Sequence, residues 1–151
     1  MADSPVIEEM DSCKYLFLAA ISEPEANSLR LTVDEGIVSG QSETLDIAGV
    51  AIPEVRSIDF TCKSRRFEIC WPSYISYSIR NESFCTWDKE EQWVGNSFRT
   101  YSKSKFLEFV ASGTFATSDY PGPFQHYEIV CVDHIVDVAS QEAPTVRVVG
   151  A

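Results

Sequence analysis

Hydrophobic and polar residues alternate along much of this chain, which is the pattern of half-buried β-strands. Between residues 28 and 33, for example, Leu29, Leu31 and Val33 fall on one face, with polar or charged residues between them. The pattern therefore predicts a chain rich in strands. Alternating strands are predicted at 28–33, 67–71 and 74–79. A compact apolar run at 14–21 predicts a buried first strand, and 145–149 predicts a short final one.

Turn residues and apolar runs indicate how these strands connect. Ile37 and Val38 follow an Asp-Glu-Gly turn and are expected to return as a hairpin partner of the strand before them. The run from Ile58 to Ile79 predicts two or three consecutive antiparallel strands, with a first turn at 63–66. The stretch from His126 to Val138 is apolar on both faces in its middle, which predicts a central strand that folds back near 133–134.

Only one segment has a strong helical pattern. A serine cap precedes Phe106, Leu107, Phe109 and Val110, and Gly113 follows them, which predicts an amphipathic helix over about residues 103–112. The fold class is therefore α+β, mainly antiparallel β-sheet with one amphipathic helix. We expect residues 1–12 to be a flexible acidic arm, and residues 13–151 to be a single globular domain.

Composition agrees with a folded domain that does not cross a membrane. Hydrophobic residues make up 44% of the 151 positions, enough for a substantial core. No apolar run approaches the ~18 residues that a membrane-spanning helix needs. The apolar stretch 15–21 follows Glu8, Glu9 and Asp11, whereas a secretory signal begins with basic residues. We therefore expect a cytoplasmic protein.

The five cysteines are odd in number and scattered, and no two form a Cys-x-x-Cys pair. A zinc site or a framework of disulfides is not expected from this spacing. We predict reduced thiols that mostly lie in the core.

Charge is the most uneven property of the sequence. The net charge is −11, and residues 1–59 alone carry twelve acidic against three basic side chains. Residues 60–110 carry eight basic and six acidic side chains, so the middle of the chain is slightly cationic. This distribution repels nucleic acid and anionic membranes and favours a basic protein partner. The residues that we predict to face that partner are Asp34, Glu35, Glu43, Asp46, Glu54 and Asp59.

A second candidate site lies around the scarce histidines. His126 and Glu128 would share one face of a strand, with His134 and Asp137 close behind, and such a set can build a metal or acid–base site. The same residues are also typical of hydrogen-bonded polar positions beside a buried strand, and we favour that interpretation because isolated matches are common. Neither a Gly-x-Ser-x-Gly elbow nor a phosphate loop is present. We assign no catalytic residue, metal or cofactor.

A short basic and aromatic patch surrounds the predicted turn at 63–66. Such patches can stack single-stranded nucleic acid, but this one is brief and its surroundings are acidic. We expect its cations to pair with acidic residues of the same chain. The patch consists of Lys63, Arg65 and Arg66 with Phe60, Phe67 and Trp71.

The chain from residue 14 onward resembles a family of uncharacterised bacterial proteins. In size, charge and class it is also similar to the small acidic immunity proteins that neutralise bacterial toxins. Neither resemblance implies a residue of known role. The segments that carry the first resemblance are 67–74, 80–84, 98–104 and 119–127.

Two functions follow as hypotheses. The first is a non-enzymatic protein-binding module, of the immunity or antitoxin type, that docks its acidic face on a basic toxin domain. The alternative is a small enzyme or ligand-binding domain with a cleft around His126, Glu128, Arg99 and Tyr101. That alternative fails if the fold places His126 and Arg99 on opposite sides of the molecule.

Overall fold

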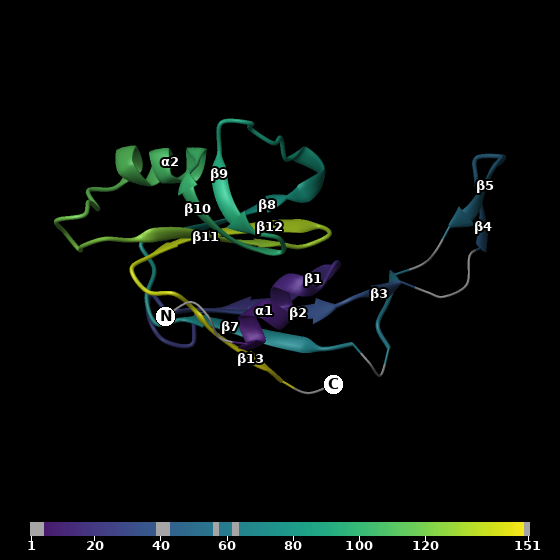
Figure 1. Ribbon diagram of the computed structural model, residues 1–151, viewed down its shortest axis with the longest axis horizontal. Coiled ribbons are helices and arrows are strands. Elements are labelled where there is room, and N and C mark those ends of the chain that lie inside the picture. Colours follow the sequence, from purple (N-terminus) through teal and green to yellow (C-terminus); the bar gives the residue numbers. More distant parts are fainter. Residues whose placement is uncertain (1–4, 39–42, 56–57, 62–63, 150–151) are drawn as a thin grey trace.

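Two antiparallel β-sheets lie face to face, and a helix covers the outer face of the larger one (Figure 1). The computed structural model describes residues 5–38, 43–55, 58–61 and 64–149, with the backbone alone at 43–47 and 51–55. This architecture confirms a mainly antiparallel α+β fold.

The strands form two main sheets and two short hairpin-like pairs. The four-stranded sheet has the order β1 (Leu16–Ser22), β2 (Leu29–Glu35), β7 (Arg66–Trp71), β13 (Thr145–Val148). The five-stranded sheet has the order β8 (Ser76–Asn81), β12 (His134–Ser140), β11 (Gln125–Val130), β10 (Phe98–Lys103), β9 (Gln92–Gly95). The short pairs are β3 (Ile37–Val38) with β6 (Ile58–Asp59), and β4 (Glu43–Ile47) with β5 (Val50–Val55). The β4–β5 pair projects away from the two sheets (Figure 1).

The hydrophobic core fills the space between the two main sheets. In β2 the predicted face of Leu29, Leu31 and Val33 is buried, because it packs against the other sheet. Every second residue in the strands of the five-stranded sheet, such as Ile129 and Val136, enters the same core from the other side. Period-two alternation in each strand therefore decides which residues enter the core.

β11 and β12 form a hairpin that is buried on both faces. The chain folds back at residues 131–133, as the sequence predicted, and pairs Val130 with Ile135 and Glu128 with Asp137. Tyr127 and Ile129 point into the core, so His126 and Glu128 point to the outer face. The register thus buries acidic side chains in the centre of the sheet.

Helix α2 (Lys105–Gly113) covers this outer face, two residues later than the predicted start. Ser104 begins it as an N-cap, because its hydroxyl oxygen accepts a hydrogen bond from the Leu107 amide at 3.1 Å. A short 3-10 helix, η1 (Glu82–Phe84), follows β8 in the connection to β9.

A second helix, α1 (Pro5–Ser12), occupies residues that we assigned to a flexible arm. Proline at the first helical position and Glu8 in the first turn both favour a helix start. Ile7 and Met10 lie three residues apart, on one side of the helix, and both are buried in the core. The acidic composition of the segment concealed this short apolar stripe.

Two predicted strand pairings are wrong. β3 pairs with β6 instead of returning on β2. β7 and β8 are consecutive but belong to different sheets, because β7 pairs with β2 and β13, whereas β8 pairs with β12. Each strand therefore finds a partner that is distant in sequence.

Within the part of the chain that the structure describes, neither helix is long and apolar enough to cross a membrane.

Candidate functional site

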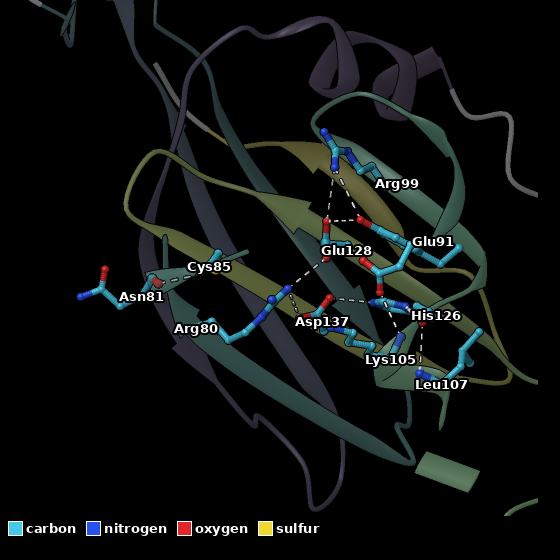
Figure 2. A network of polar contacts seen from close by, with 12 residues as sticks. Arg80, Asn81, Cys85, Glu91, Arg99, Lys105, Leu107, His126, Glu128 and Asp137 are labelled. Carbon is cyan, nitrogen blue, oxygen red and sulfur yellow. Dashed lines mark hydrogen bonds and ion pairs between the residues drawn. The ribbon is translucent and has the colours of Figure 1, made fainter. Parts of the chain in front are cut away.

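A network of polar side chains lies on the outer face of the five-stranded sheet, beneath α2 and the β8–β9 connection (Figure 2). Alternation places these side chains on one face, since the residues between them enter the core. The network comprises Arg80 from β8, Arg99 and Tyr101 from β10, Ser104 at the start of α2, His126 and Glu128 from β11, and Asp137 from β12.

Glu128 and Asp137 lie directly opposite each other in the hairpin register, and each side chain is only 2% exposed. Arg80 compensates both carboxyl groups. Its Nη2 lies 3.1 Å from Asp137 Oδ2 and 3.5 Å from Glu128 Oε2. Since the Arg80 side chain is 44% exposed, it reaches the pair from the solvent side of the sheet.

His126 links the cap of α2 to β12. Its Nδ1 lies 2.8 Å from Ser104 Oγ and its Nε2 lies 2.7 Å from Asp137 Oδ1. Ser104 Oγ accepts a hydrogen bond from the Leu107 amide, so the hydroxyl hydrogen is free to donate to Nδ1. These contacts are all satisfied by an imidazole that carries its proton on Nε2 and donates it to Asp137.

Glu128 has two further partners from β10. The Tyr101 hydroxyl donates to Glu128 Oε1 at 2.9 Å, and an Arg99 nitrogen lies 3.8 Å from the same oxygen. The Arg99 guanidinium in turn lies between the rings of Trp87 and Trp93, 5.2 and 4.7 Å from their centroids. Arg99 is therefore held in place, whereas Arg80 has a half-exposed side chain.

The two carboxyl groups have pKa values displaced in opposite directions. Burial, followed by the hydrogen bond with Asp137 and its charge, raises the pKa of Glu128 to about 8. Burial also acts to raise the pKa of Asp137, but hydrogen bonds from His126 and Glu128 and the charge of Arg80 lower it overall. Pairs of carboxyl groups displaced in this way are frequent at functional sites.

A cavity of about 210 Å³ opens onto the network. The sheet forms its floor, the β8–β9 connection one wall and the first turn of α2 another. We call this cavity the cleft. Its lining residues are Ser78, Arg80, Thr86, Asp88, Glu91, Lys105, Phe106, His126, Glu128 and Asp137.

Ser104, His126 and Asp137 form a hydrogen-bonded chain of the residue types found in serine hydrolases. Ser104 is nevertheless 3% exposed and does not line the cleft. Its oxygen is also committed to the helix cap. We therefore assign Ser104 a positioning role for His126 and no role as a nucleophile.

Three members of the network offer metal-ligand atoms close together. One atom each from His126, Glu128 and Asp137 lie within 4.8 Å of one another, and all three residues are buried. An imidazole nitrogen with two carboxylate oxygens is a donor set that divalent transition metals accept.

The structure brings together the four residues of the predicted cleft. His126 and Glu128 line it, while Tyr101 and Arg99 contact Glu128 from β10. His126 and Arg99 consequently lie on the same side of the sheet. Sequence reasoning did not find the part played by Arg80, which comes from a strand 48 residues away from Glu128 in sequence.

Two of the predicted partner-facing acids pair with arginines of the same chain. Glu35 accepts hydrogen bonds from Arg65 Nε and Nη2 at 3.0 Å each, and Asp34 accepts from Arg66 at 2.6 and 2.9 Å. This confirms that the basic patch pairs with acids of the same chain. Lys63 lies outside the described residues.

The other four predicted partner-facing acids lie on the short strands β4, β5 and β6. Asp59 is exposed on β6. Glu43, Asp46 and Glu54 belong to the β4–β5 pair, where only the backbone is described. A partner-facing role for all six residues stays a prediction.

A second cavity, of about 410 Å³, lies over Asp34, Phe60, Arg65 and Arg66. Although it is larger, the carboxylates that Arg65 and Arg66 contact are fully compensated by bidentate hydrogen bonds. It holds no counterpart of the buried cluster in the cleft, and we therefore consider the cleft the stronger candidate.

The described cysteines are free thiols, two buried and two half-buried. Burial raises the pKa values of Cys13 and Cys131 to about 12, so neither is a thiolate at neutral pH. Cys13 instead donates to Glu35 and contributes to the ion-pair network beside α1.

Comparison with known proteins gives no relative: no family model, curated protein or solved structure matches the chain. The resemblance to a family of uncharacterised bacterial proteins therefore stays a prediction. Any function has to be inferred from the geometry of the site.

The Glu35–Arg65 pair generates a prediction for stability against pH. The hydrogen bond from Arg65 holds the pKa of Glu35 below its ordinary value of 4.5. The stabilisation is therefore present above pH 4.5 and is lost as the pH falls through the lowered pKa. We expect Glu35→Gln to reduce the free energy of unfolding by about 1–2 kcal/mol at pH 7. The difference from the unmodified protein should vanish near pH 2 in urea denaturation.

Asp34→Asn is the matched control, because Asp34 pairs with the more exposed Arg66. A smaller loss than for Glu35→Gln is expected there, because solvent screens the exposed pair. An equal loss in both variants, or a Glu35→Gln effect that does not change with pH, would contradict the assignment.

Proposed function

We propose that this protein is a small-ligand-binding domain whose site is the cleft above β8, β12 and β11. The observation that supports the proposal is the buried network of ionisable side chains that opens onto a cavity. Small-molecule sites combine such a concavity with a few convergent polar groups.

The free-energy cost of burying charged side chains indicates that the network serves a function and is not there to stabilise the fold. Moving a carboxylate from water into a protein interior costs several kcal/mol, which paired charges only partly recover. Leucine or valine at the positions of Glu128 and Asp137 would pack beneath α2 without that penalty. Ionisable residues retained beside a cavity are therefore best explained by an interaction that needs them.

The cleft also limits the size and chemistry of its ligand. A volume of about 210 Å³ corresponds to about seven water molecules, less than the pockets that hold drug-sized compounds. Arg80 and Lys105 supply donors, and the carboxyl groups of Asp88, Glu91 and Asp137 supply acceptors. A compact polar molecule or ion with both kinds of hydrogen-bonding group fits this lining.

A library of small polar fragments, containing amines, carboxylic acids and phosphates, tests the proposal by protein-observed NMR. We expect the binders to shift the backbone amides of Ser78, Arg80 and Lys105. Filling the cleft from its floor, with Ser78→Phe, and separately from one wall, with Thr86→Trp, should weaken each binder by about tenfold or more, or ~1.4 kcal/mol.

Lys89→Trp adds a bulky ring to the same loop without lining the cleft, and it should leave binding unchanged. Fragments that bind elsewhere, or that bind equally well after the cleft is filled, would refute the proposal.

Protein binding is a second candidate, as the charge distribution suggested. Of the twelve large hydrophobic side chains exposed among the described residues, seven lie between β8 and β11. Exposed aromatic side chains are typical anchors of protein interfaces. An inhibitor of a basic toxin domain would use exposed aromatic side chains of this kind as anchors. The seven residues are Phe84, Trp87, Trp93, Val94, Phe109, Phe115 and Tyr120.

Replacement of Phe84 and Phe115 by serine tests this second function, since their side chains are 84% and 82% exposed. A basic protein captured by the unmodified chain should bind the double variant at least about tenfold more weakly in a titration with purified partner. Val148→Ser, on the opposite sheet, is the control. A partner that binds all three proteins equally would exclude this surface.

A further inference from the structure

The cluster of His126, Glu128 and Asp137 has the arrangement of a three-ligand metal site. β11 supplies two ligands at i and i+2 on one face, and β12 supplies the third directly opposite Glu128. His126 Nε2 and Asp137 Oδ1 are 2.7 Å apart, and one ligand atom from each of the three residues falls within 4.8 Å. Small side-chain shifts therefore suffice to bring all three atoms around one ion.

The donor types narrow the choice of ion. Imidazole nitrogen suits zinc and other transition metals, whereas carboxylate oxygen also suits manganese. Catalytic zinc sites commonly use three protein ligands and leave a fourth position for water or substrate. Here the fourth position would face the cleft, which all three residues line.

Neighbouring side chains orient two of these ligands, as is usual around bound metals. Ser104 Oγ lies 2.8 Å from His126 Nδ1 and can accept a hydrogen bond from it in the tautomer that carries its proton on Nδ1, which leaves Nε2 free for the ion. The Tyr101 hydroxyl fixes one oxygen of Glu128 at 2.9 Å. Both partners come from elements other than the strands that carry the ligands.

Arg80 occupies the position of a competing cation. Its Nη2 contacts both carboxyl groups, yet its side chain is 44% exposed and reaches them from the solvent. An incoming divalent ion would displace the guanidinium into the cleft or into solvent. Arg99 would remain, since Trp87, Trp93 and the Asn96 carbonyl hold it.

We propose that His126, Glu128 and Asp137 bind one divalent transition-metal ion, Zn²⁺ or Mn²⁺, as the inorganic ligand of the cleft. The proposal rests on the proposed ligand-binding function and names part of its ligand. It requires Arg80 to leave the two carboxylates when the ion enters. That requirement separates it from a cleft in which Arg80 itself contacts the ligand.

The test is calorimetric titration of the tag-free, full-length protein with Zn²⁺ and, separately, with Mn²⁺. We expect one ion per chain. Asp137→Asn and His126→Ala should weaken binding by more than about 100-fold, beyond the effect usual for an outer-shell change. Arg80→Met should strengthen it by about tenfold, because it removes a cation next to the site.

His134→Gln is the control for adventitious binding, since His134 is the remaining histidine and lies outside the cluster. It should leave the affinity unchanged. Circular dichroism of each variant verifies that it is folded.

Absence of a stoichiometric ion, binding that survives both Asp137→Asn and His126→Ala, or weaker binding after Arg80→Met would each overturn the metal proposal. Fragment binding that is lost when the cleft is filled, in a protein that takes up neither ion, would overturn the metal site while upholding the ligand-binding function. Loss of both would refute both.

Discussion

The cross-strand pairing of Glu128 with Asp137 is the constraint on which the outer layer depends. The β11–β12 register places the two carboxyl groups side by side in the middle of a sheet whose other face is the hydrophobic core. Neither group reaches bulk water, so each must be neutralised or hydrogen-bonded where it stands. The surrounding elements supply the required partners.

These partners tie the outer layer together. Arg80 connects β8 to the pair, and Tyr101 connects β10. His126 connects β12 to the N-cap of α2 through Ser104. One set of polar contacts thus fixes the helix, the sheet and the floor of the cleft, which is the rigidity that a binding site needs.

Local patterns in the sequence were sufficient for much of the fold. Alternation located β2, β7 and β13, and a serine cap before an apolar stripe located α2 within two residues. These features depend on a residue and its near neighbours. α1 was missed because its apolar face is short, with Ile7 and Met10 buried and Val6 partly buried, and the acidic residues around them resemble a solvated arm.

The site was only partly predictable, for a related reason. A turn centred on residues 133–134 would place Glu128 opposite Ala139, two residues from its observed partner Asp137. The proximity of the two acids, though not their exact pairing, was therefore within reach of sequence reasoning. Arg80 was not, because β8 joins the sheet beside β12 through a pairing that no local pattern encodes. Pairings between strands distant in sequence also explain why β7 and β8 lie in different sheets. β7 pairs with β2 and β8 pairs with β12, so the prediction that these consecutive strands pair with each other is wrong.

Acidity is less informative than it first appears from the sequence. Asp34 and Glu35 lie in the strongly acidic first third, yet both are paired with arginines that follow in sequence at positions 65 and 66. Charge counted along the chain therefore overstates the charge presented to a partner. The chemically distinctive groups lie in the last third, within a sheet.

The central claim is that the network positions the outer layer for ligand binding and gives the fold no more stability than packed apolar side chains would give. The most direct test replaces it with apolar side chains of similar size, Arg80→Met, His126→Phe, Glu128→Leu and Asp137→Leu, in one variant. Our account predicts a free energy of unfolding in urea that is unchanged or raised by about 1–4 kcal/mol, as for other buried ion pairs replaced by packed hydrophobic groups. A fall of more than about 3 kcal/mol, with an unchanged dependence on urea concentration, would contradict it.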